Sequence, residues 1–260
     1  MEIVILPGPD EVARVAAQRV ADVVRRRRDA VIGLATGSSP LGLYAELARR
    51  VAEGELDLSG VSGFALDEYV GIPPEHPESY ASVIRRTVTE PLGLAPGRVH
   101  VPDGRAPDLH AAADAYERAI GAAGGIDVQV LGIGANGHIG FNEPTSSFAS
   151  RTRVTTLAPR TRADNARFFG TPDEVPVHCL TQGLATILEA RRLLLVAQGV
   201  VKAVAVAAAV EGPLTSMCPA SVLQLHPRAT VLVDEAAAGR LRLADYYRYM
   251  HAHRPAGPAP

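Results

Sequence analysis

Chemically active side chains follow four short apolar runs of the sequence, at the point where each run ends. The stretches are TGSSP (36–40), DEYVG (67–71), GANGHIGFNEP (134–144) and QGVVK (198–202). Together they supply hydroxyls, carboxylates, an imidazole and an ammonium group, which are the groups that bind a phosphate and move protons. These residues therefore point to acid–base chemistry on a small phosphorylated metabolite.

The glycines of GIGANG (132–137) match the G-x-G-x-x-G pattern of a dinucleotide-binding turn. That turn needs a helix that starts at the third glycine and an acidic residue about 20 positions further on. Here HIGFNEP follows, whose glycine and proline disfavour a helix, and VTTLAP (154–159) carries no carboxylate. We therefore expect no dinucleotide cofactor. The segment instead presents His138 and Glu143 on a loop whose glycines let a ligand come close to the backbone.

The segment ATGSSP (35–40) lies between an apolar run and a helical pattern. Backbone N–H groups at a helix N-terminus, together with the hydroxyls of Thr36, Ser38 and Ser39, can form a phosphate cradle. Simple N-capping of the helix by a serine is the alternative for this segment alone. No Gly-Lys-Ser/Thr follows, so the pattern does not indicate a nucleotide P-loop.

Asp67 and Glu68 stand at the end of an apolar run, and either could do chemistry or cap a turn. A carboxylate that leaves a buried strand and enters a pocket can act as a general base with a raised pKa. Lys202 is the only lysine of the chain, since the other 25 basic residues are arginines. Its compact ammonium group suits a phosphate in a way that a guanidinium fork does not reproduce.

The elements that must position these residues alternate between strands and helices. We expect strands at 2–6, 30–35, 62–66, 98–102, 127–133, 191–197 and 229–234, and helices at 10–25, 40–52, 109–122 and 201–210. Continuously apolar strands separated by helices favour a parallel sheet that is covered on both faces. We predict a single α/β domain over residues 1–250, with a doubly wound, mostly parallel, Rossmann-like sheet and helices on both faces. The Pro- and Gly-rich residues 251–260 are predicted to form a flexible tail.

Composition excludes several classes of partner. The 260 residues carry a net charge of −2, which favours neither nucleic acid nor an anionic membrane. No apolar stretch is long enough to span a bilayer, and the N-terminus has no signal-peptide pattern. Cys179 and Cys218 lie outside any C-x-x-C, which is typical of free thiols in a reducing compartment. We therefore expect a cytoplasmic protein, and the spacing of its His, Cys, Asp and Glu residues indicates no metal site.

The motifs together resemble the glucosamine-6-phosphate deaminase family. The resemblance extends over about residues 2–250 and rests on ATGSSPLGLY, LDEYVGIPPEHPESY, GIGANGHIGFNEPTSSFASRTR, TRADNARFF, AVEGPLTSMCPASVLQLHP and the lone lysine. It implies an enzyme of amino-sugar catabolism that needs no cofactor and converts glucosamine 6-phosphate and water to fructose 6-phosphate and ammonia. The expected partner is the small sugar phosphate itself, and a homo-oligomer is left open.

The resemblance also implies a role for each matching residue. Asp67 matches the base that moves a proton between C2 and C1 of the substrate. His138 matches the imidazole that opens the sugar ring, assisted by Glu143, and Asn136 replaces an aspartate that some members carry in the same set. The residues that match the phosphate site are Thr36, Gly37, Ser38, Ser39, Arg167 and Lys202.

Two further segments bear on regulation and access. Residues 157–180 resemble a mobile lid of the family, which would exclude water during the reaction. Ser146 and Arg153 match residues that bind the activator N-acetylglucosamine 6-phosphate in strongly regulated members, but Thr155 replaces their lysine. The sequence therefore predicts weak or absent activation by that compound.

Two alternatives share the sugar-phosphate theme. A 6-phosphogluconolactonase-like hydrolase would have a related fold without needing Asp67, His138 and Glu143 in this arrangement. A sugar-phosphate effector-binding module of a transcription regulator would be expected to carry DNA-binding helices before its first strand. The first strand is predicted here at residues 2–6, which favours the enzyme.

Overall fold

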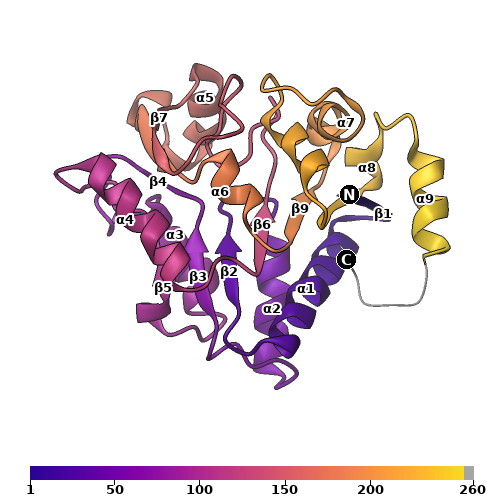
Figure 1. Ribbon diagram of the computed structural model, residues 1–260, viewed down its shortest axis with the longest axis horizontal. Helices are drawn as coiled ribbons and strands as arrows, with labels where there is room; N and C mark the ends of the chain where they lie inside the picture. The colour runs from indigo at the N-terminus through magenta and orange to yellow at the C-terminus, as the bar shows by residue number, and fades with distance from the viewer. Residues whose placement is uncertain (255–260) are drawn as a thin grey trace.

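The computed structural model describes residues 1–254 and arranges their strands in two sheets (Figure 1). The larger sheet has seven strands, all parallel, in the order β1-β10-β9-β6-β2-β3-β5. They are β1 (Glu2–Leu6), β2 (Val31–Leu34), β3 (Ser62–Ala65), β5 (Val99–His100), β6 (Val128–Leu131), β9 (Leu193–Ala197) and β10 (Ala229–Asp234). The seven strands coincide with the seven predicted runs, and the predicted parallel α/β sheet is confirmed.

Helices surround this sheet. The four predicted ones are α1 (Pro9–Arg26), α2 (Leu41–Ala52), α4 (Leu109–Ala122) and α7 (Ala203–Glu211). Those that the sequence did not predict are α3 (Tyr80–Ile84), α5 (Pro159–Phe169), α6 (Leu184–Leu188), α8 (Glu235–Ala238) and α9 (Ala244–Ala252). Short turns of other helix types are η1 (Arg85–Thr89), η2 (Pro96–Arg98), η3 (Pro172–Glu174), η4 (Val200–Lys202) and η5 (Pro219–Leu225). Every residue of β2, β6, β9 and β10 is buried, so these strands are covered on both faces.

The C-terminal boundary differs from the predicted one. Helix α9 continues to Ala252 and so includes the first two residues of the predicted flexible tail. Residues 255–260 of that predicted tail lie outside the described residues.

The smaller sheet is a feature that the sequence did not predict. Its three antiparallel strands, in the order β4-β8-β7, are β4 (Asp67–Tyr69), β7 (Arg153–Thr156) and β8 (His178–Thr181). In Figure 1 it lies with α5 beyond the upper ends of the central strands. Because β4 follows β3 after a single residue, the small sheet begins where a strand of the large sheet ends.

The strand order contains a switch point between β2 and β6. From β2 the chain moves outward through β3 to β5, and then returns to place β6 on the other side of β2. Ligands of doubly wound sheets bind at the carboxyl ends of the two strands that flank such a point. The segments that leave β2 and β6 are residues 35–40 and 132–144, which the sequence analysis singled out.

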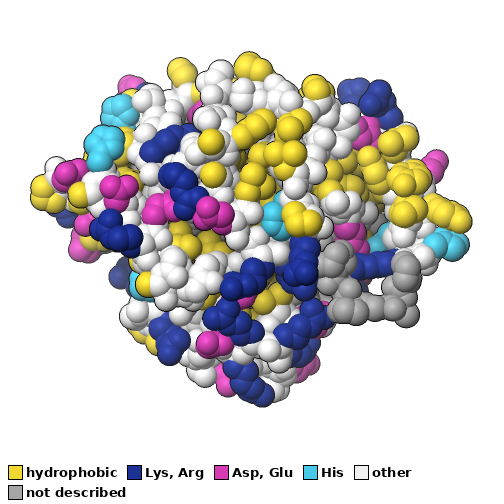
Figure 2. All heavy atoms as spheres, viewed as in Figure 1, with side chains coloured by type: hydrophobic (Ala, Val, Ile, Leu, Met, Phe, Trp, Pro, Cys, Tyr) yellow, Lys and Arg dark blue, Asp and Glu magenta, His cyan; other side chains and the backbone are white. Residues whose placement is uncertain are grey.

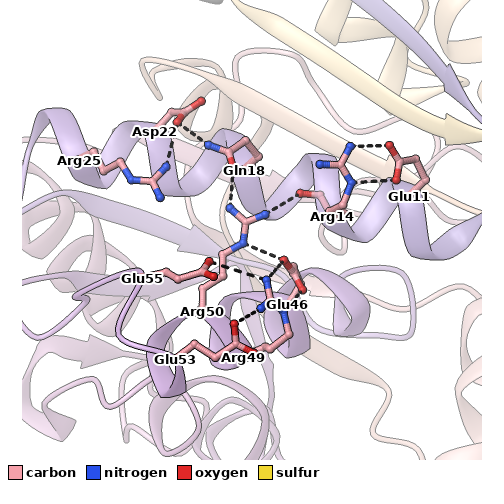
Figure 3. Close-up of polar contacts among 10 residues, drawn as sticks. All are labelled: Glu11, Arg14, Gln18, Asp22, Arg25, Glu46, Arg49, Arg50, Glu53 and Glu55. Carbon is pink, nitrogen blue, oxygen red and sulfur yellow. Dashed lines mark hydrogen bonds and ion pairs between the residues drawn. The ribbon is translucent and has the colours of Figure 1, made fainter.

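The helix that follows the first of these segments is fixed by a buried arginine. Arg50 of α2 is only 5% exposed, and its guanidinium group contacts Gln18 and the Arg14 carbonyl of α1, at 2.6 and 3.5 Å (Figure 3). Its Nε also donates to Oε1 of Glu46 at 2.8 Å. Because removing one partner from a buried charged network is costly, these contacts hold α2 against α1. The segment at residues 35–40 is held in place with it.

On the face drawn in Figure 2, basic side chains gather over the lower central part, and basic and acidic side chains are mixed on the left. Hydrophobic side chains gather over α9, where Tyr246, Tyr249 and Met250 are more than half exposed. Within the described residues, no helix combines the length and the apolar character that crossing a membrane requires.

Candidate active site

A cavity of about 650 Å³ opens at the carboxyl ends of the central strands. It is bounded by the segments that follow β2, β3, β6 and β9, and by helix α5. Three other cavities of about 10 to 30 Å³ are too small for a metabolite. The predicted site residues that line the large cavity are Thr36, Gly37, Ser38, Ser39, Asp67, His138, Arg167 and Lys202.

The segment after β2 forms one wall of the cavity. Helix α2 has Pro40 as its N-cap residue and no side-chain hydrogen bond at that cap, so the alternative of a serine cap is not what the structure contains. Gly37 has a φ of +90°, a conformation that glycine adopts without strain. Gly132, at the end of β6, lies against Ser39, since a Cβ placed there would be 3.9 Å from the serine Cβ. The two strand ends at the switch point therefore meet at this wall.

Two cations face the same region from different elements. Lys202 ends η4 after strand β9, and its Nζ donates to the Ile133 carbonyl at 2.7 Å. Arg167 comes from α5 and also lines the cavity. Burial lowers the pKa of Lys202, and the charge of Arg167 lowers it further, while Asp164 acts in the opposite direction. Two cations that line the same cavity favour the binding of an anion there.

Asp67 and Glu68 follow β3 together but have different environments. Asp67 lines the cavity and is 4% exposed; burial and the neighbouring Glu68 raise the pKa of Asp67 to about 8. The Glu68 carboxylate accepts backbone N–H groups from Tyr69, Tyr80 and Ala81 at 2.8 to 2.9 Å. The capping alternative thus applies to Glu68, which fixes the start of α3, and Asp67 is the carboxyl group at the cavity.

The imidazole of His138 is backed by a carboxylate and an amide. Its Nδ1 lies 3.7 Å from Oε2 of Glu143, and the same oxygen accepts the Asn136 side-chain amide at 2.7 Å. Asn136 Oδ1 accepts the backbone N–H of His138 at 3.2 Å. Burial opposes ionisation of Glu143, but the adjacent imidazole of His138 and hydrogen bonds from Thr161 and Asn136 outweigh it and lower the pKa of Glu143 to about 2. Glu143 and Asn136 lie behind the imidazole and are not among the cavity-lining residues.

Two glycines of residues 132–137 are needed because neighbouring side chains pack directly against their backbone. No helix follows Gly137, as expected from the sequence. A Cβ at Gly134 would lie only 2.2 Å from Cε1 of His138, so the imidazole ring rests directly against this backbone. Gly137 has a φ of +85°, and a Cβ there would lie 2.6 Å from Sγ of Cys218. The motif shapes a tight turn that seats His138.

Helix α5 covers the cavity and contacts the small sheet. Asn165 Nδ2 donates to the Tyr69 hydroxyl at 3.0 Å, and the Phe169 ring packs edge-on against Tyr69 with centroids 5.4 Å apart. Tyr80 and Phe141 complete this aromatic cluster below α5. A lid at 157–180 is expected from the sequence, but the aromatic cluster that α5 contacts was not predicted. The signal was present, because Tyr69 and Phe141 stand inside the motifs DEYVG and GHIGFNEP.

The residues matched to an activator site are bonded to one another. Arg153 of β7 donates to Ser146 Oγ at 3.1 Å and to Asn142 Oδ1 at 2.9 Å. Thr155, on the same strand, lies opposite Cys179 of β8. Arg153 thus joins the small sheet to the segment that carries His138.

Among residues 1–254, no group of three or more His, Cys, Asp and Glu side chains is arranged to hold a metal ion. What the cavity brings together is a hydroxyl-rich wall with two cations, a carboxyl group of raised pKa, and an imidazole backed by an ionised carboxylate. This combination can hold a phosphate and transfer protons at carbon and oxygen.

Comparison with known proteins gives consistent matches over most of the chain. The family of glucosamine-6-phosphate isomerases and 6-phosphogluconolactonases matches residues 9–232. A glucosamine-6-phosphate deaminase from Arthrobacter sp. (strain FB24) is 59% identical over 256 residues, and one from Streptomyces coelicolor is 56% identical; each match covers 98% of both chains. A solved monomeric glucosamine-6-phosphate deaminase superposes with a TM-score of 0.90 at 41% identity, over 92% of this chain and all of that one. A 6-phosphogluconolactonase from Trypanosoma cruzi, 20% identical with a TM-score of 0.76 over 93% of this chain and 97% of its own, shares the fold.

Proposed function

The chain belongs to the family of glucosamine-6-phosphate isomerases and 6-phosphogluconolactonases, and on that premise we propose that it acts as a glucosamine-6-phosphate deaminase. It converts glucosamine 6-phosphate and water to fructose 6-phosphate and ammonia, a step of amino-sugar catabolism. The observation that carries this function is the cavity that Asp67 and His138 line together with the hydroxyl-rich segment after β2 and the two cations.

The lactonase alternative is less well supported. Lactonases of known structure resemble this chain at 17 to 20% identity, which establishes the shared fold alone. Relatives named glucosamine-6-phosphate deaminase are 41 to 59% identical over nearly the whole chain. A hydrolase acting on a lactone also has no need of a base placed for proton transfer between two carbons. An effector-binding module needs no acid–base catalysis, so that alternative does not explain the pairing of His138 with Glu143.

In the proposed complex, the substrate phosphate lies against the segment after β2 and between Arg167 and Lys202. Hydroxyls of Thr36, Ser38 and Ser39 and the backbone at Gly37 supply hydrogen bonds, and the two cations supply charge. The phosphate fixes one end of the sugar, so its C1 and C2 are directed to the other groups of the cavity.

Ring opening is assigned to His138. The proton of the anomeric hydroxyl leaves and the ring oxygen gains one, so a single group that accepts and returns a proton suffices. Glu143, ionised at all working pH values, faces Nδ1 of the imidazole and favours a proton on that nitrogen. The other nitrogen, Nε2, is then available for the exchange. Asn136 holds both the Glu143 carboxylate and the His138 backbone in position.

Proton transfer between carbons is assigned to Asp67. The ionised carboxylate removes the proton from C2 of the open-chain sugar while the carbonyl oxygen at C1 gains a proton, which gives an enolamine. The carboxylate then returns its proton to C1 and the amino group loses one, so that the net change moves one proton from C2 to C1 and one from nitrogen to oxygen and leaves an imine at C2. Water then adds to C2 and ammonia leaves, giving the ketose. A base with a pKa near the working pH accepts and returns a proton with little cost, and the pKa of Asp67 is raised to about 8. Helix α5 excludes bulk water during these steps.

The activity is tested by incubating the protein with glucosamine 6-phosphate and measuring ammonia and fructose 6-phosphate. Both products are expected in equal amounts. A protein that releases neither, but hydrolyses 6-phosphogluconolactone, would contradict the proposed function.

The pH dependence of kcat/KM is expected to reflect Asp67. Because the base must be ionised, kcat/KM should rise with pH and level off above about 8, the pKa to which burial raises Asp67. The measurement is kcat/KM from about pH 5.5 to 9.5, with the substrate phosphate expected to titrate near pH 6. A profile already level above about pH 5, where an ordinary carboxyl group is ionised, would contradict this environment for Asp67.

Regulation by N-acetylglucosamine 6-phosphate is expected to be weak or absent. Thr155 stands where strongly regulated relatives carry a lysine, and a lost charge-assisted contact is worth about 1.5–3 kcal/mol, comparable to a whole allosteric coupling. Arg153 and Ser146 are also bonded to each other within the chain. Substrate saturation curves should therefore be near-hyperbolic with and without the compound. A sigmoidal curve that becomes hyperbolic when it is added would contradict the prediction.

The oligomeric state and the location of the protein are two further questions. The sequence leaves a homo-oligomer open, and sedimentation analysis would measure the oligomeric state; the 41% identical solved structure is that of a monomeric enzyme. We infer a cytoplasmic location because both cysteines are unpaired thiols, as expected in a reducing compartment.

A further inference from the structure

Asp67 has a direct neighbour on the adjacent strand of the small sheet. In the antiparallel pair of β4 and β8, Asp67 lies opposite Thr181. Residues directly opposite each other in such a pair place their side chains on the same face, with Cβ atoms about 4.5–5.5 Å apart. Thr181 is completely buried and is not a lining residue of the cavity, so it lies behind the carboxyl group rather than beside the substrate.

The backbone of the His138 segment brings the two side chains together. A Cβ placed on Gly140 would lie 3.1 Å from Oγ1 of Thr181 and 3.4 Å from Oδ2 of Asp67. Both oxygens therefore lie next to the same backbone position, Gly140. Because glycine has no Cβ, no side chain occupies the space beside these two oxygens, and glycine adopts the φ of +53° at this position without strain.

The hydrogen bonds around the Thr181 hydroxyl show where its single proton is directed. The backbone N–H of Phe141 donates to Oγ1 at 3.1 Å, so the hydroxyl acts as an acceptor on that side. Its own proton can go to the Asp67 carboxylate or to the Gln182 carbonyl, 3.3 Å away. That carbonyl already accepts the Asn142 amide at 2.8 Å. Hydrogen bonds to an ionised acceptor are the stronger ones, so the carboxylate is the favoured partner.

We propose that Thr181 is a positioning residue for the catalytic base: its hydroxyl holds one oxygen of the Asp67 carboxylate, so that the other oxygen faces C1 and C2 of the sugar. This inference rests on the proposed function, in which Asp67 transfers the proton. The hydroxyl favours the ionised carboxylate and so opposes the effect of burial on the pKa of Asp67. Its removal is therefore expected to raise that pKa further.

Other titratable groups face Asp67 and must be considered in a pH experiment. They are Glu68, Tyr69, Tyr80, Tyr116 and Cys179. Burial raises the pKa of each of the three tyrosines and of the cysteine, so these four are neutral where the base ionises. Glu68 is held by three backbone N–H groups on β4 and α3, which no change at Thr181 touches.

The experiment compares kcat and kcat/KM as functions of pH for Thr181→Val, Thr181→Ser and the unchanged protein. Valine has nearly the shape of threonine and lacks the hydroxyl, while serine keeps it. Thr156→Val is the matched control, since Thr156 lies on β7 of the same small sheet, where its hydroxyl contacts His178. Thr181→Ala removes the same hydroxyl, and it gives the same readings if valine prevents folding.

In Thr181→Val, the rise of kcat/KM is expected to move upward by about one to two pH units, the equivalent of one hydrogen bond to a charged group. Near pH 7 the loss is then about tenfold to a hundredfold, and it shrinks as the pH increases. KM should change little, Thr181→Ser should restore the profile, and Thr156→Val should match the unchanged protein.

Two results would overturn the inference. One is a Thr181→Val profile whose rise stays at the original pH. The other is an equal loss at every pH that Thr181→Ser does not restore, because that pattern indicates a merely structural role. Failure of the proposed function is distinguishable from both, since the unchanged protein would then release neither ammonia nor fructose 6-phosphate. Failure of the role of Asp67 is distinguishable as well, since Asp67→Asn would then keep its turnover whatever happens at Thr181.

Discussion

Asp67→Asn is expected to lower the turnover of glucosamine 6-phosphate by about 10²–10⁴-fold or more, while substrate binding is kept. Asparagine fills the space of the carboxyl group but cannot take up a proton. The proposed phosphate contacts lie on other elements, after β2 and β9 and on α5, so they do not depend on this side chain. Solvent deuterium should also no longer enter the substrate at C2, because no group removes the C2 proton.

Asp127→Asn is the matched control for this experiment. Asp127 is a buried carboxylate just before β6, at the opposite end of the sheet, where it pairs with Arg27 and Arg191. The same chemical change there is expected to affect the stability of the fold and to leave the turnover of the folded protein unchanged. Near-normal turnover of Asp67→Asn, with deuterium exchange retained, would contradict the role of Asp67.

The stability of Asp67→Asn offers a second test of the environment of this carboxyl group. Its pKa is raised from 3.8 to about 8 in the fold, so the folded chain holds this proton more tightly than the unfolded chain. Its contribution to stability is therefore fully present below about pH 4 and is lost as the pH rises through about 8. The Tm of the asparagine variant relative to the unchanged protein should accordingly increase across this range and then level off.

The large sheet could be predicted from the sequence because each of its strands is a continuous apolar run between helical patterns. The small sheet could not. Strand β4 has three residues, two of them acidic, and β7 is only partly buried, so neither shows a run or an alternation that periodicity could detect. Both strands depend on pairing with β8, in which Thr181 lies opposite Asp67 although the two residues are 114 positions apart in the sequence (181 − 67).

The position of the candidate site in the fold could be predicted from the sequence, because it depends only on where the strands end. The carboxyl ends of parallel strands meet at one edge, so residues that follow β2, β3, β6 and β9 converge there without any knowledge of the contacts. Which of two adjacent carboxylates faces the cavity was not decided by that rule. Glu68 is fixed by N–H groups of α3, a five-residue helix that no sequence pattern indicated. The contact of Asn165 with Tyr69, 96 residues apart, was likewise beyond local reasoning.

Lys202→Ala is expected to raise KM for glucosamine 6-phosphate about tenfold to a hundredfold, since a charge-assisted hydrogen bond contributes about 1.5–3 kcal/mol. The effect on kcat should be smaller, because the contact with the phosphate is present before and during the reaction. Alanine also removes the bond from Nζ to the Ile133 carbonyl, so part of any change could come from the backbone at the end of β6. Unphosphorylated glucosamine separates the two causes, because it uses the backbone but has no phosphate to bind.

The comparison is therefore the ratio of kcat/KM for the phosphorylated and unphosphorylated sugars in three proteins. In Lys202→Ala this ratio should fall about tenfold to a hundredfold. In Val201→Ala, which truncates the neighbouring cavity-lining residue without changing charge, it should stay the same. Arg167 remains in Lys202→Ala and is expected to keep part of the affinity for phosphate, which is why the expected fall is limited. An equal loss on both sugars would mean that Lys202 supports the strand end at Ile133 and does not bind the phosphate.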